Sequence, residues 1–356
     1  MYINHKIYSD DINSVANENL QWEKLSGKNL LLTGASGLVG TVLVDVLMKK
    51  NRAENLNVKI FAAGRNEKIA NERFADYLGD KNFEFLKLDV NAPIEIDFPV
   101  DFIIHAASNT HPLLYSTDPV GTMMTNILGT YNLLEFGLQK KIERFVFVSS
   151  VEIYGKALDE DDLFDEKYCG YIDCNTLRAG YPEAKRAAEA LCQSYISRHN
   201  LNIVIPRLSR IYGATMRLND SKAMSEFIMN GVRGEDIVLK SKGVPRFSYC
   251  CATDCVSGIL FCLLKGKCGE AYNVADSSEI LSLREIAEYI SSLAGKKVVF
   301  ELPSETQAKG FSKAVNAIMP NEKLRGLGWT PKDDTRSGVK KTVEILRAIV
   351  SKERLT

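Results

Sequence analysis

A tyrosine and a lysine four residues apart, Tyr181 and Lys185 in the segment Y-P-E-A-K, could carry acid/base chemistry. Four residues along a helix place both side chains on one face. An ammonium beside a phenol favours the phenolate, so we expect Lys185 to lower the pKa of Tyr181 from its ordinary value of about 10. A hydroxyl from Ser149 or Ser150 could complete the proton path. By itself, however, the pair is more typical of an amphipathic helix with a packed tyrosine and a solvated lysine.

A glycine-rich turn near the N-terminus indicates what such a pair would work with. The apolar run 29–33 leads into G-A-S-G-L-V-G at 34–40 and then into a helical stretch that reaches Lys50. This spacing lets the backbone turn tightly and approach a pyrophosphate, whose charge the amides at the helix N-terminus stabilise. The flanking strand and helix favour dinucleotide binding over an ordinary tight turn. The residues expected to contact the dinucleotide here are Gly34, Ser36, Gly37, Leu38, Val39 and Gly40.

Strand and helix patterns alternate along the first 206 residues. Apolar β-type runs at 58–63, 83–88, 102–107, 144–149 and 202–206 alternate with helical stretches at 66–78, 120–139 and 181–199. This alternation predicts an α/β fold, a Rossmann-like doubly wound parallel sheet that binds ligands beyond the carboxyl ends of its strands. We expect a dinucleotide-binding domain over 27–206 and a smaller mixed cap over 207–356, with some strands of 207–280 returning to the first domain.

Composition excludes several classes of partner. The chain has 356 residues, 45% hydrophobic and 25% charged, and its 45 basic residues balance 45 acidic ones, so nothing indicates nucleic acid or an anionic membrane surface. No apolar run approaches the roughly 18 to 20 residues of a membrane span, and we expect a cytoplasmic protein. The eight cysteines form no C-x-x-C pair, so we expect no metal site.

The residues after the second strand bear on the choice of dinucleotide. An acidic residue there would bind the adenosine ribose hydroxyls of NAD, but this chain has Gly64-Arg65-Asn66. An arginine can accommodate the 2′-phosphate of NADP, although Arg65 could equally be solvated or stacked on adenine. The sequence therefore favours NADP over NAD only slightly. Asp89 is positioned to meet the adenine edge, and a turn or helix-capping role is an equal alternative.

Four further motifs follow the glycine turn in order: H-A-A-S at 105–108, N-I-L-G-T at 126–130, S-S-V-E-I-Y-G at 149–155 and Y-P-E-A-K at 181–185. From about Gly27 to Arg347 the chain resembles the extended short-chain dehydrogenases/reductases of the NAD-dependent epimerase/dehydratase family. The resemblance implies a sugar-nucleotide substrate held by the cap and a homodimer formed by the helices at 120–139 and 181–199. It also implies cofactor contacts from Asp89, Val90, Ala106, Ala107, Ser108, Asn126, Tyr181 and Lys185.

Within that family the chain looks most like UDP-glucuronate decarboxylases, through segments at 177–186, 212–228 and 245–249. The resemblance implies oxidation of the sugar C4 hydroxyl, with Tyr181 taking the proton and Ser150 bonding the C4 oxygen. Glu152 would then act near C5, as the decarboxylases and 4,6-dehydratases carry a carboxylate there, whereas 4-epimerases usually carry a small residue. A ketone beta to the C6 carboxylate makes loss of carbon dioxide easy.

Four cations are candidates for binding the substrate. We expect Arg246 in P-R-F-S-Y to bind the diphosphate, with help from Lys222, and Arg178 to meet the distal charge of the substrate. Arg210 stands where the resembling enzymes usually have an asparagine, which leaves the identity of the sugar and of the nucleotide open. A 4,6-dehydratase, a 4-epimerase and a catalytically silent dinucleotide-binding protein remain alternatives.

Overall fold

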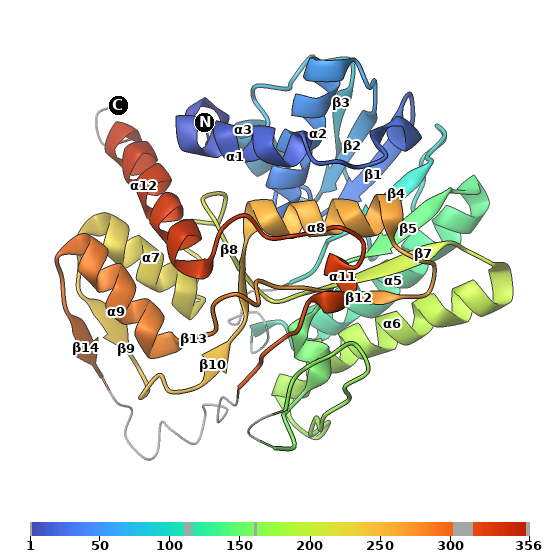
Figure 1. The fold of residues 1–356 in the computed structure, drawn as a ribbon. Coiled ribbons are helices and arrows are strands. Elements are labelled where there is room, and N and C mark those ends of the chain that lie inside the picture. Colours follow the sequence, from blue (N-terminus) through green and yellow to red (C-terminus); the bar gives the residue numbers. More distant parts are fainter. Residues whose placement is uncertain (1, 110–114, 116, 160–161, 302–315, 354–356) are drawn as a thin grey trace.

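The computed structural model describes residues 2–109, 115, 117–159, 162–301 and 316–353 (Figure 1). Its largest sheet has eight strands, in the order β12-β7-β5-β4-β1-β2-β3, with β6 paired to β7. All of its neighbouring strands run parallel. These strands are β1 (Asn29–Thr33), β2 (Lys59–Gly64), β3 (Phe83–Lys87), β4 (Phe102–His105), β5 (Arg144–Phe147), β6 (Ser149–Ser150), β7 (Ile203–Leu208) and β12 (Ala271–Val274).

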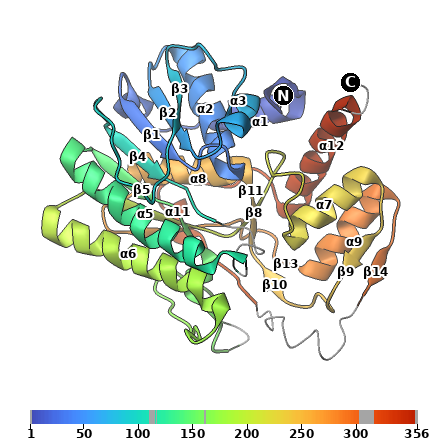
Figure 2. The same cartoon turned by 180° about the vertical axis from the view of Figure 1, so that it is seen from behind.

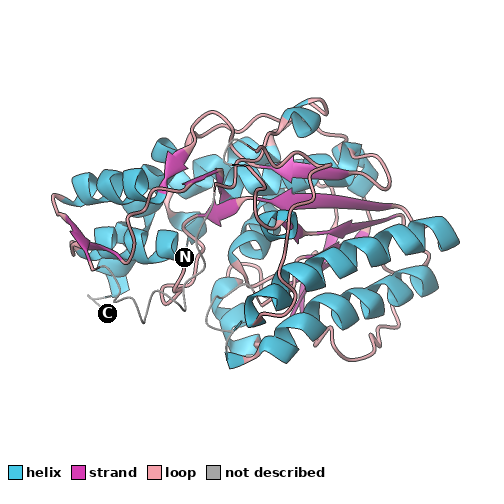
Figure 3. Cartoon of the chain, turned by 90° about the horizontal axis from the view of Figure 1, so that it is seen from below, coloured by secondary structure: helices cyan, strands magenta, loops and turns pink. Residues whose placement is uncertain are grey.

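Helices cover both faces of this sheet (Figures 1 and 2). On one face lie α1 (Lys6–Ala16), α2 (Leu38–Glu54) and α8 (Ala252–Lys265), and on the other lie α5 (Pro119–Lys140) and α6 (Gly180–His199). The view from below shows the strands between the helical layers (Figure 3). Because both faces are covered, strands such as β1 read as continuous apolar runs whose side chains are almost all buried. The expected doubly wound parallel sheet is confirmed.

Local signals account for where the helices begin and end. The Asp118 side chain accepts a hydrogen bond from the Gly121 amide and caps α5, which has a proline in its first turn. The helix α2 ends at Glu54 and is followed by Asn55, which caps it in a left-handed conformation with φ of +52°. The short helix α3 (Glu67–Arg73) follows β2 and ends earlier than the expected stretch 66–78, because the chain turns before Gly79, whose φ is +86°.

A second lobe is built from the C-terminal part of the chain and lies beside the sheet (Figure 1). Its core joins α7 (Ala223–Arg233), α9 (Leu283–Ala294) and α12 (Thr335–Glu353). The smaller sheets pair β8 (Arg210–Tyr212) with β11 (Tyr249–Cys251), β9 (Ile237–Leu239) with β14 (Val298–Phe300), and β10 (Arg246–Phe247) with β13 (Leu281–Ser282). The short helices are η1 (Tyr2–Asn4), η2 (Trp22–Leu25), η3 (Val151–Tyr154), η4 (Leu177–Ala179) and α11 (Glu322–Arg325).

The two lobes do not divide the chain at a single point. The strand β12 pairs with β7 in the large sheet, and α8 packs on that sheet, so this part of 207–280 belongs to the first lobe. Helix α1 also packs there, although it precedes the expected start at residue 27. Within the described residues, no helix is both long and apolar enough to cross a membrane.

Candidate active site

The turn between β1 and α2 brings its backbone against a neighbouring strand end. Gly34 has φ of +73°, and a Cβ atom at this position would lie 2.7 Å from the backbone of Ala106. A Cβ atom on Gly40 would lie 2.4 Å from the carbonyl oxygen of Gly34. Both positions therefore require glycine: Gly34 because of its positive φ and the adjacent backbone of Ala106, and Gly40 because α2 packs directly onto the turn. The result is a cradle of backbone amides of the kind that binds a pyrophosphate.

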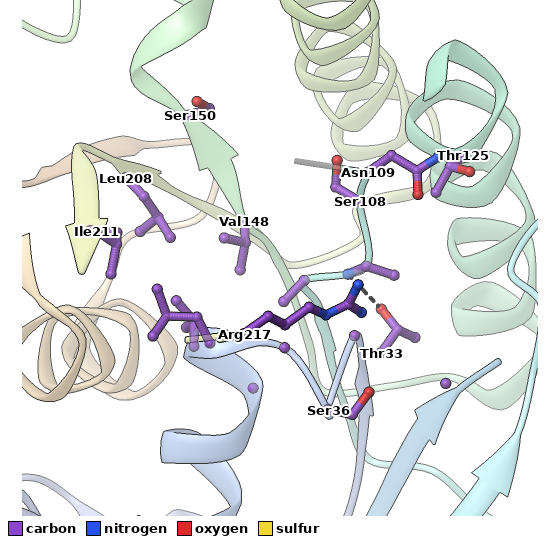
Figure 4. Close-up of a pocket in the computed structure, with 18 of the residues that line it drawn as sticks. Thr33, Ser36, Ser108, Asn109, Thr125, Val148, Ser150, Leu208, Ile211 and Arg217 are labelled. Atoms are coloured by element: carbon purple, nitrogen blue, oxygen red, sulfur yellow. Dashed lines mark hydrogen bonds between the residues drawn. The ribbon is translucent and has the colours of Figure 1, made fainter. Parts of the chain in front are cut away.

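A cavity of about 900 Å³ opens beside this turn, at the carboxyl ends of the parallel strands, and extends to the second lobe. Figure 4 shows part of it, with Ser36 at the glycine turn, Ser108 on the loop after β4 and Ser150 at the end of β6. All the residues expected at the site line this cavity except Asn126, Arg178 and Arg246.

Tyr181 lies at the start of α6 and is buried in the cavity wall. Burial raises the pKa of its phenol to about 12, although hydrogen bonds with the hydroxyls of Ser150 and Ser108 lower it in part. The expectation that Lys185 depresses this pKa is wrong for this structure, since the desolvation of Tyr181 outweighs the charges and hydrogen bonds that favour the phenolate. The phenol is therefore protonated near neutral pH.

Lys185 is 3% exposed, and its ammonium donates a hydrogen bond to the carbonyl oxygen of Val148 at 2.8 Å. The ammonium also lies over the Phe147 ring, 4.6 Å from its centroid. Burial lowers the pKa of Lys185 to about 8, against the opposing effect of Glu189. Lys185 is thus tied to the end of β5 by its hydrogen bond and its ring contact.

The structure decides between the two candidate serines. The Ser150 hydroxyl lies close enough to Tyr181 to lower the pKa of its phenol in part, whereas the Ser149 hydroxyl donates to the carboxylate of Glu189. Glu189 also forms an ion pair with Arg207 at 2.6 Å. Both serines line the cavity, but the Ser149 hydroxyl is bonded to Glu189, so Ser150 is the candidate hydroxyl for the proton path.

Glu152 follows Ser150 on η3 and lines the same cavity. Both of its carboxylate oxygens accept hydrogen bonds from Arg178, each at 3.3 Å. Arg178 does not line the cavity itself and lies over the ring of Tyr115, 5.4 Å from its centroid. The Tyr115 ring in turn stacks on Tyr181, with centroids 5.0 Å apart. The Glu152 carboxylate, the Arg178 guanidinium and the rings of Tyr115 and Tyr181 therefore form one connected group beside the cavity.

The cations of the second lobe are not arranged as expected. Arg246 pairs with Glu285 at 2.9 Å and donates to the carbonyl oxygen of Ile280, and it does not line the cavity. Arg210 does line the cavity, with its guanidinium carbon 3.8 Å from the centroid of the Phe247 ring. Lys222 also lines it and forms an ion pair with Asp220 at 3.7 Å. The expected diphosphate role of Arg246 is therefore not supported by its position.

Several residues that line the cavity were not predicted from the sequence. Arg217 lines the cavity, and Figure 4 shows its long side chain there. It lies in the segment 212–228 that supported the family resemblance, but nothing in its spacing singled it out. Within the described part of the chain, the hydroxyls of Ser209 and Tyr249 are buried without a hydrogen-bond partner, and both residues line the cavity. Buried polar groups without a partner are rare in native structures, and a polar ligand in the cavity would supply one.

Asn126 supports the site from behind. Its side chain is fully buried, donates to the carbonyl oxygen of Thr122 and accepts a hydrogen bond from Ser108 at 2.9 Å. It therefore orients the Ser108 hydroxyl that hydrogen-bonds with Tyr181. No group of three His, Cys, Asp or Glu side chains that could hold a metal ion occurs among the residues described.

The chain is similar in sequence to known proteins. Residues 30–275 match the sequence profile described as the NAD dependent epimerase/dehydratase family. UDP-glucuronic acid decarboxylase 5 of Arabidopsis thaliana is 30% identical over 88% of this chain and 88% of its own.

Solved structures show the same fold. A dTDP-glucose 4,6-dehydratase from Streptomyces venezuelae, solved with NAD, matches with a TM-score of 0.76 and 22% identity over 92% of this chain and all of its own. A UDP-glucuronic acid 4-epimerase from Bacillus cereus, solved with UDP-glucuronic acid and NAD, matches with a TM-score of 0.76 and 19% identity over 90% of this chain and 99% of its own. From its sequence match, its glycine cradle and its Ser150, Tyr181 and Lys185 set, the chain belongs to the NAD dependent epimerase/dehydratase family.

Proposed function

We propose that this chain is a nucleotide-sugar decarboxylase that acts on UDP-glucuronate or a close relative of it. The observation that carries the proposal is the meeting of Ser150, Tyr181 and Glu152 in one cavity, with Arg178 paired to Glu152. The first two side chains suit oxidation of a carbinol. The last two supply a carboxylate on the cavity wall and a guanidinium bonded to it, and we infer that they act on the carboxylate of an acidic sugar.

Oxidation at C4 assigns a role to each group of the proton path. When bound in the glycine cradle, an oxidised nicotinamide supplies a hydride acceptor and a positive charge. Because burial keeps the Tyr181 phenol protonated, it must first lose its own proton, and the positive charge of a bound nicotinamide would favour that loss. The Tyr181 phenolate would then receive the proton of the C4 hydroxyl, and Ser150 would hydrogen-bond the C4 oxygen. Lys185, anchored on Val148, would bind the ribose next to the nicotinamide.

Loss of carbon dioxide follows from the position of the new ketone. The C4 ketone is beta to the C6 carboxylate, so the C5–C6 bond can break with its electron pair passing into an enolate across C4 and C5. A proton would then add to C5, and the hydride returned from the reduced nicotinamide to C4 would give a pentose nucleotide. We infer that Glu152, which lines the cavity, guides that proton, and that Arg178 exchanges its bonds with Glu152 for bonds with the substrate carboxylate.

The second lobe contributes positive charge to the nucleotide end. Arg210, Arg217 and Lys222 all line the cavity on that side. A pyrophosphate linkage is matched by such cations, and guanidinium groups bind phosphate oxygens in a fixed fork. We propose that Arg210, together with Arg217 and Lys222, takes the diphosphate role first expected of Arg246.

Mass spectrometry of the products tests the reaction. The full chain incubated with UDP-glucuronate should give carbon dioxide and a pentose nucleotide. If the product of UDP-glucuronate has an unchanged mass and a new retention time, the reaction is an epimerisation. If a hexose nucleotide loses water, the reaction is a dehydration. If neither UDP-glucuronate nor a hexose nucleotide gives any of these three products, and no reduced-nicotinamide absorbance is seen, the protein is catalytically silent.

A variant pair separates the two chemical stages. Glu152→Gln should retain oxidation, seen as reduced-nicotinamide absorbance, while slowing the release of carbon dioxide by roughly 100-fold. Glu183→Gln on α6 removes a carboxylate that does not line the cavity and should leave both stages unchanged. Equal rates of carbon dioxide release from both variants would remove Glu152 from the mechanism.

We also propose that the chain forms a homodimer through α5. Three large apolar side chains of that helix are exposed: Val120 at 70%, Met124 at 40% and Tyr131 at 44%. Burial of such a stripe against a second copy would remove it from water. Light scattering at micromolar concentration should therefore give the mass of two chains, and a monomer mass would refute the proposal.

A further inference from the structure

The end of β2 forms one wall of the cavity, beside the position where the adenosine ribose of a bound dinucleotide is expected. Gly64, Arg65 and Asn66 all line the cavity there. A carboxylate directly at this strand end would bind the ribose hydroxyls of NAD and would repel a 2′-phosphate. This chain carries a glycine and an arginine instead.

The glycine is not required by packing. Gly64 does not have a positive φ, and an added Cβ atom would meet only the Phe85 ring at 3.6 Å and the Ser36 hydroxyl at 3.8 Å. Both distances are ordinary van der Waals contacts, so a side chain would be tolerated at this position. Its absence therefore leaves room beside a hydroxyl donor, at the rim where a ribose substituent would project.

Two cations border the same space. Arg65 donates to the side-chain oxygen of Asn109 at 3.3 Å, and this neutral amide does not compensate its charge. A guanidinium has five N–H donors in a fixed fork, so further donors remain for a phosphate. Lys87 at the end of β3 is the register partner of Gly64 and also lines the cavity.

Glu67 is a nearby carboxylate, and a carboxylate at the ribose would favour NAD over NADP. It lies in the first turn of α3, lines the cavity and is exposed. It follows the strand end by three residues, whereas Arg65 follows it immediately. The other cavity carboxylate at this end, Asp89, accepts a hydrogen bond from the amide of Asn91 at 3.0 Å and closes its own turn.

We propose that Ser36, Arg65 and Lys87 form a subsite for the 2′-phosphate of NADP, so that the chain binds NADP in preference to NAD. The inference depends on dinucleotide binding and not on the fate of the sugar, so it goes beyond the proposed decarboxylation. It also sets this chain apart from the relatives in the structural comparison that were solved with NAD.

Titration calorimetry of the full chain, freed of any co-purified dinucleotide, tests the subsite without a sugar substrate. NADP should bind at least tenfold more tightly than NAD. Arg65→Ala should weaken NADP binding by roughly 10- to 100-fold, the usual range for a lost charge-assisted hydrogen bond, and change NAD binding by less than about threefold. The control Lys68→Ala removes an exposed lysine of α3 that does not line the cavity, and it should change neither affinity.

Other results would overturn the inference. An equal loss of NAD and NADP affinity in Arg65→Ala would mean that the arginine stacks on adenine. A loss of NAD affinity in Glu67→Gln, together with tighter binding of NAD than NADP by the unaltered chain, would assign the ribose to Glu67. As a second variant, Gly64→Asp should bind NAD more tightly than NADP. If this variant melts cooperatively and still prefers NADP, the proposed subsite is refuted.

Discussion

In the unaltered protein, titration of Lys185 should make the free energy of unfolding rise between about pH 8 and pH 10. Replacement of Lys185 with methionine should remove this rise. Lys185 is 3% exposed, and burial lowers the pKa of its ammonium to about 8. The same group in an unfolded chain titrates near pH 10.4. Since the folded pKa lies below the unfolded one, the unfolded state binds more protons between these values, and stability rises with pH in that window.

The size of the effect follows from the two pKa values. At pH 7 the protonated lysine costs the folded state about 3 kcal/mol, and by pH 10 most of that cost has gone. The unaltered protein should therefore gain about 2.5 kcal/mol between pH 7 and pH 10, relative to the Lys185→Met variant. Titrations common to both proteins cancel in this difference.

Urea denaturation of both proteins at pH 7, 8, 9 and 10, followed by far-ultraviolet circular dichroism, measures the difference in the free energy of unfolding. Lys68→Met removes an exposed lysine and controls for the loss of one positive charge. A difference between the unaltered protein and Lys185→Met that stays constant over this pH range would refute the reasoning. The variant should also lose turnover, because its charge is part of the proposed active site.

Three further changes give distinct outcomes. Tyr181→Phe should abolish turnover of the sugar nucleotide while dinucleotide affinity, measured by calorimetry, changes by less than about threefold, because the phenol carries the proton and not the cofactor. Gly40→Ala would bring a Cβ atom to 2.4 Å from the carbonyl oxygen of Gly34, so dinucleotide affinity and melting temperature should both fall. Glu189→Gln leaves Arg207, whose side chain is 11% exposed, without its carboxylate, and urea denaturation should show a loss of about 3 to 5 kcal/mol.

Each of these predictions has a clear contrary result. Near-normal turnover in Tyr181→Phe would contradict the proton path, and unchanged dinucleotide affinity in Gly40→Ala would contradict the close approach of α2 to the turn. For Glu189, the control is Glu183→Gln, whose partner Arg186 lies 3.5 Å away in a more exposed pair. That variant should lose less than about 1 kcal/mol, and an equal loss in both would contradict the role of burial.

The fold was largely predictable because its signals are local. The periodic apolar runs located the sheet strands and most helices to within a few residues, since both faces of a parallel sheet must be buried. The return of β12 to the large sheet was expected only in outline. The packing of α1 on that sheet was not expected, because pairing between distant segments leaves little trace in either of them.

The sequence alone predicted three features that line the cavity: the glycine turn, the Tyr181 and Lys185 pair and the carboxylate of Glu152. Residue type and spacing suffice there, because a backbone turn and a helix face are set by residues that are close along the chain. Tertiary structure alone decided that Ser150 and not Ser149 meets Tyr181, and that Arg210 and not Arg246 lines the cavity. It also showed that burial raises the Tyr181 pKa. Solvent exclusion and the choice between neighbouring side chains depend on groups brought together from distant segments.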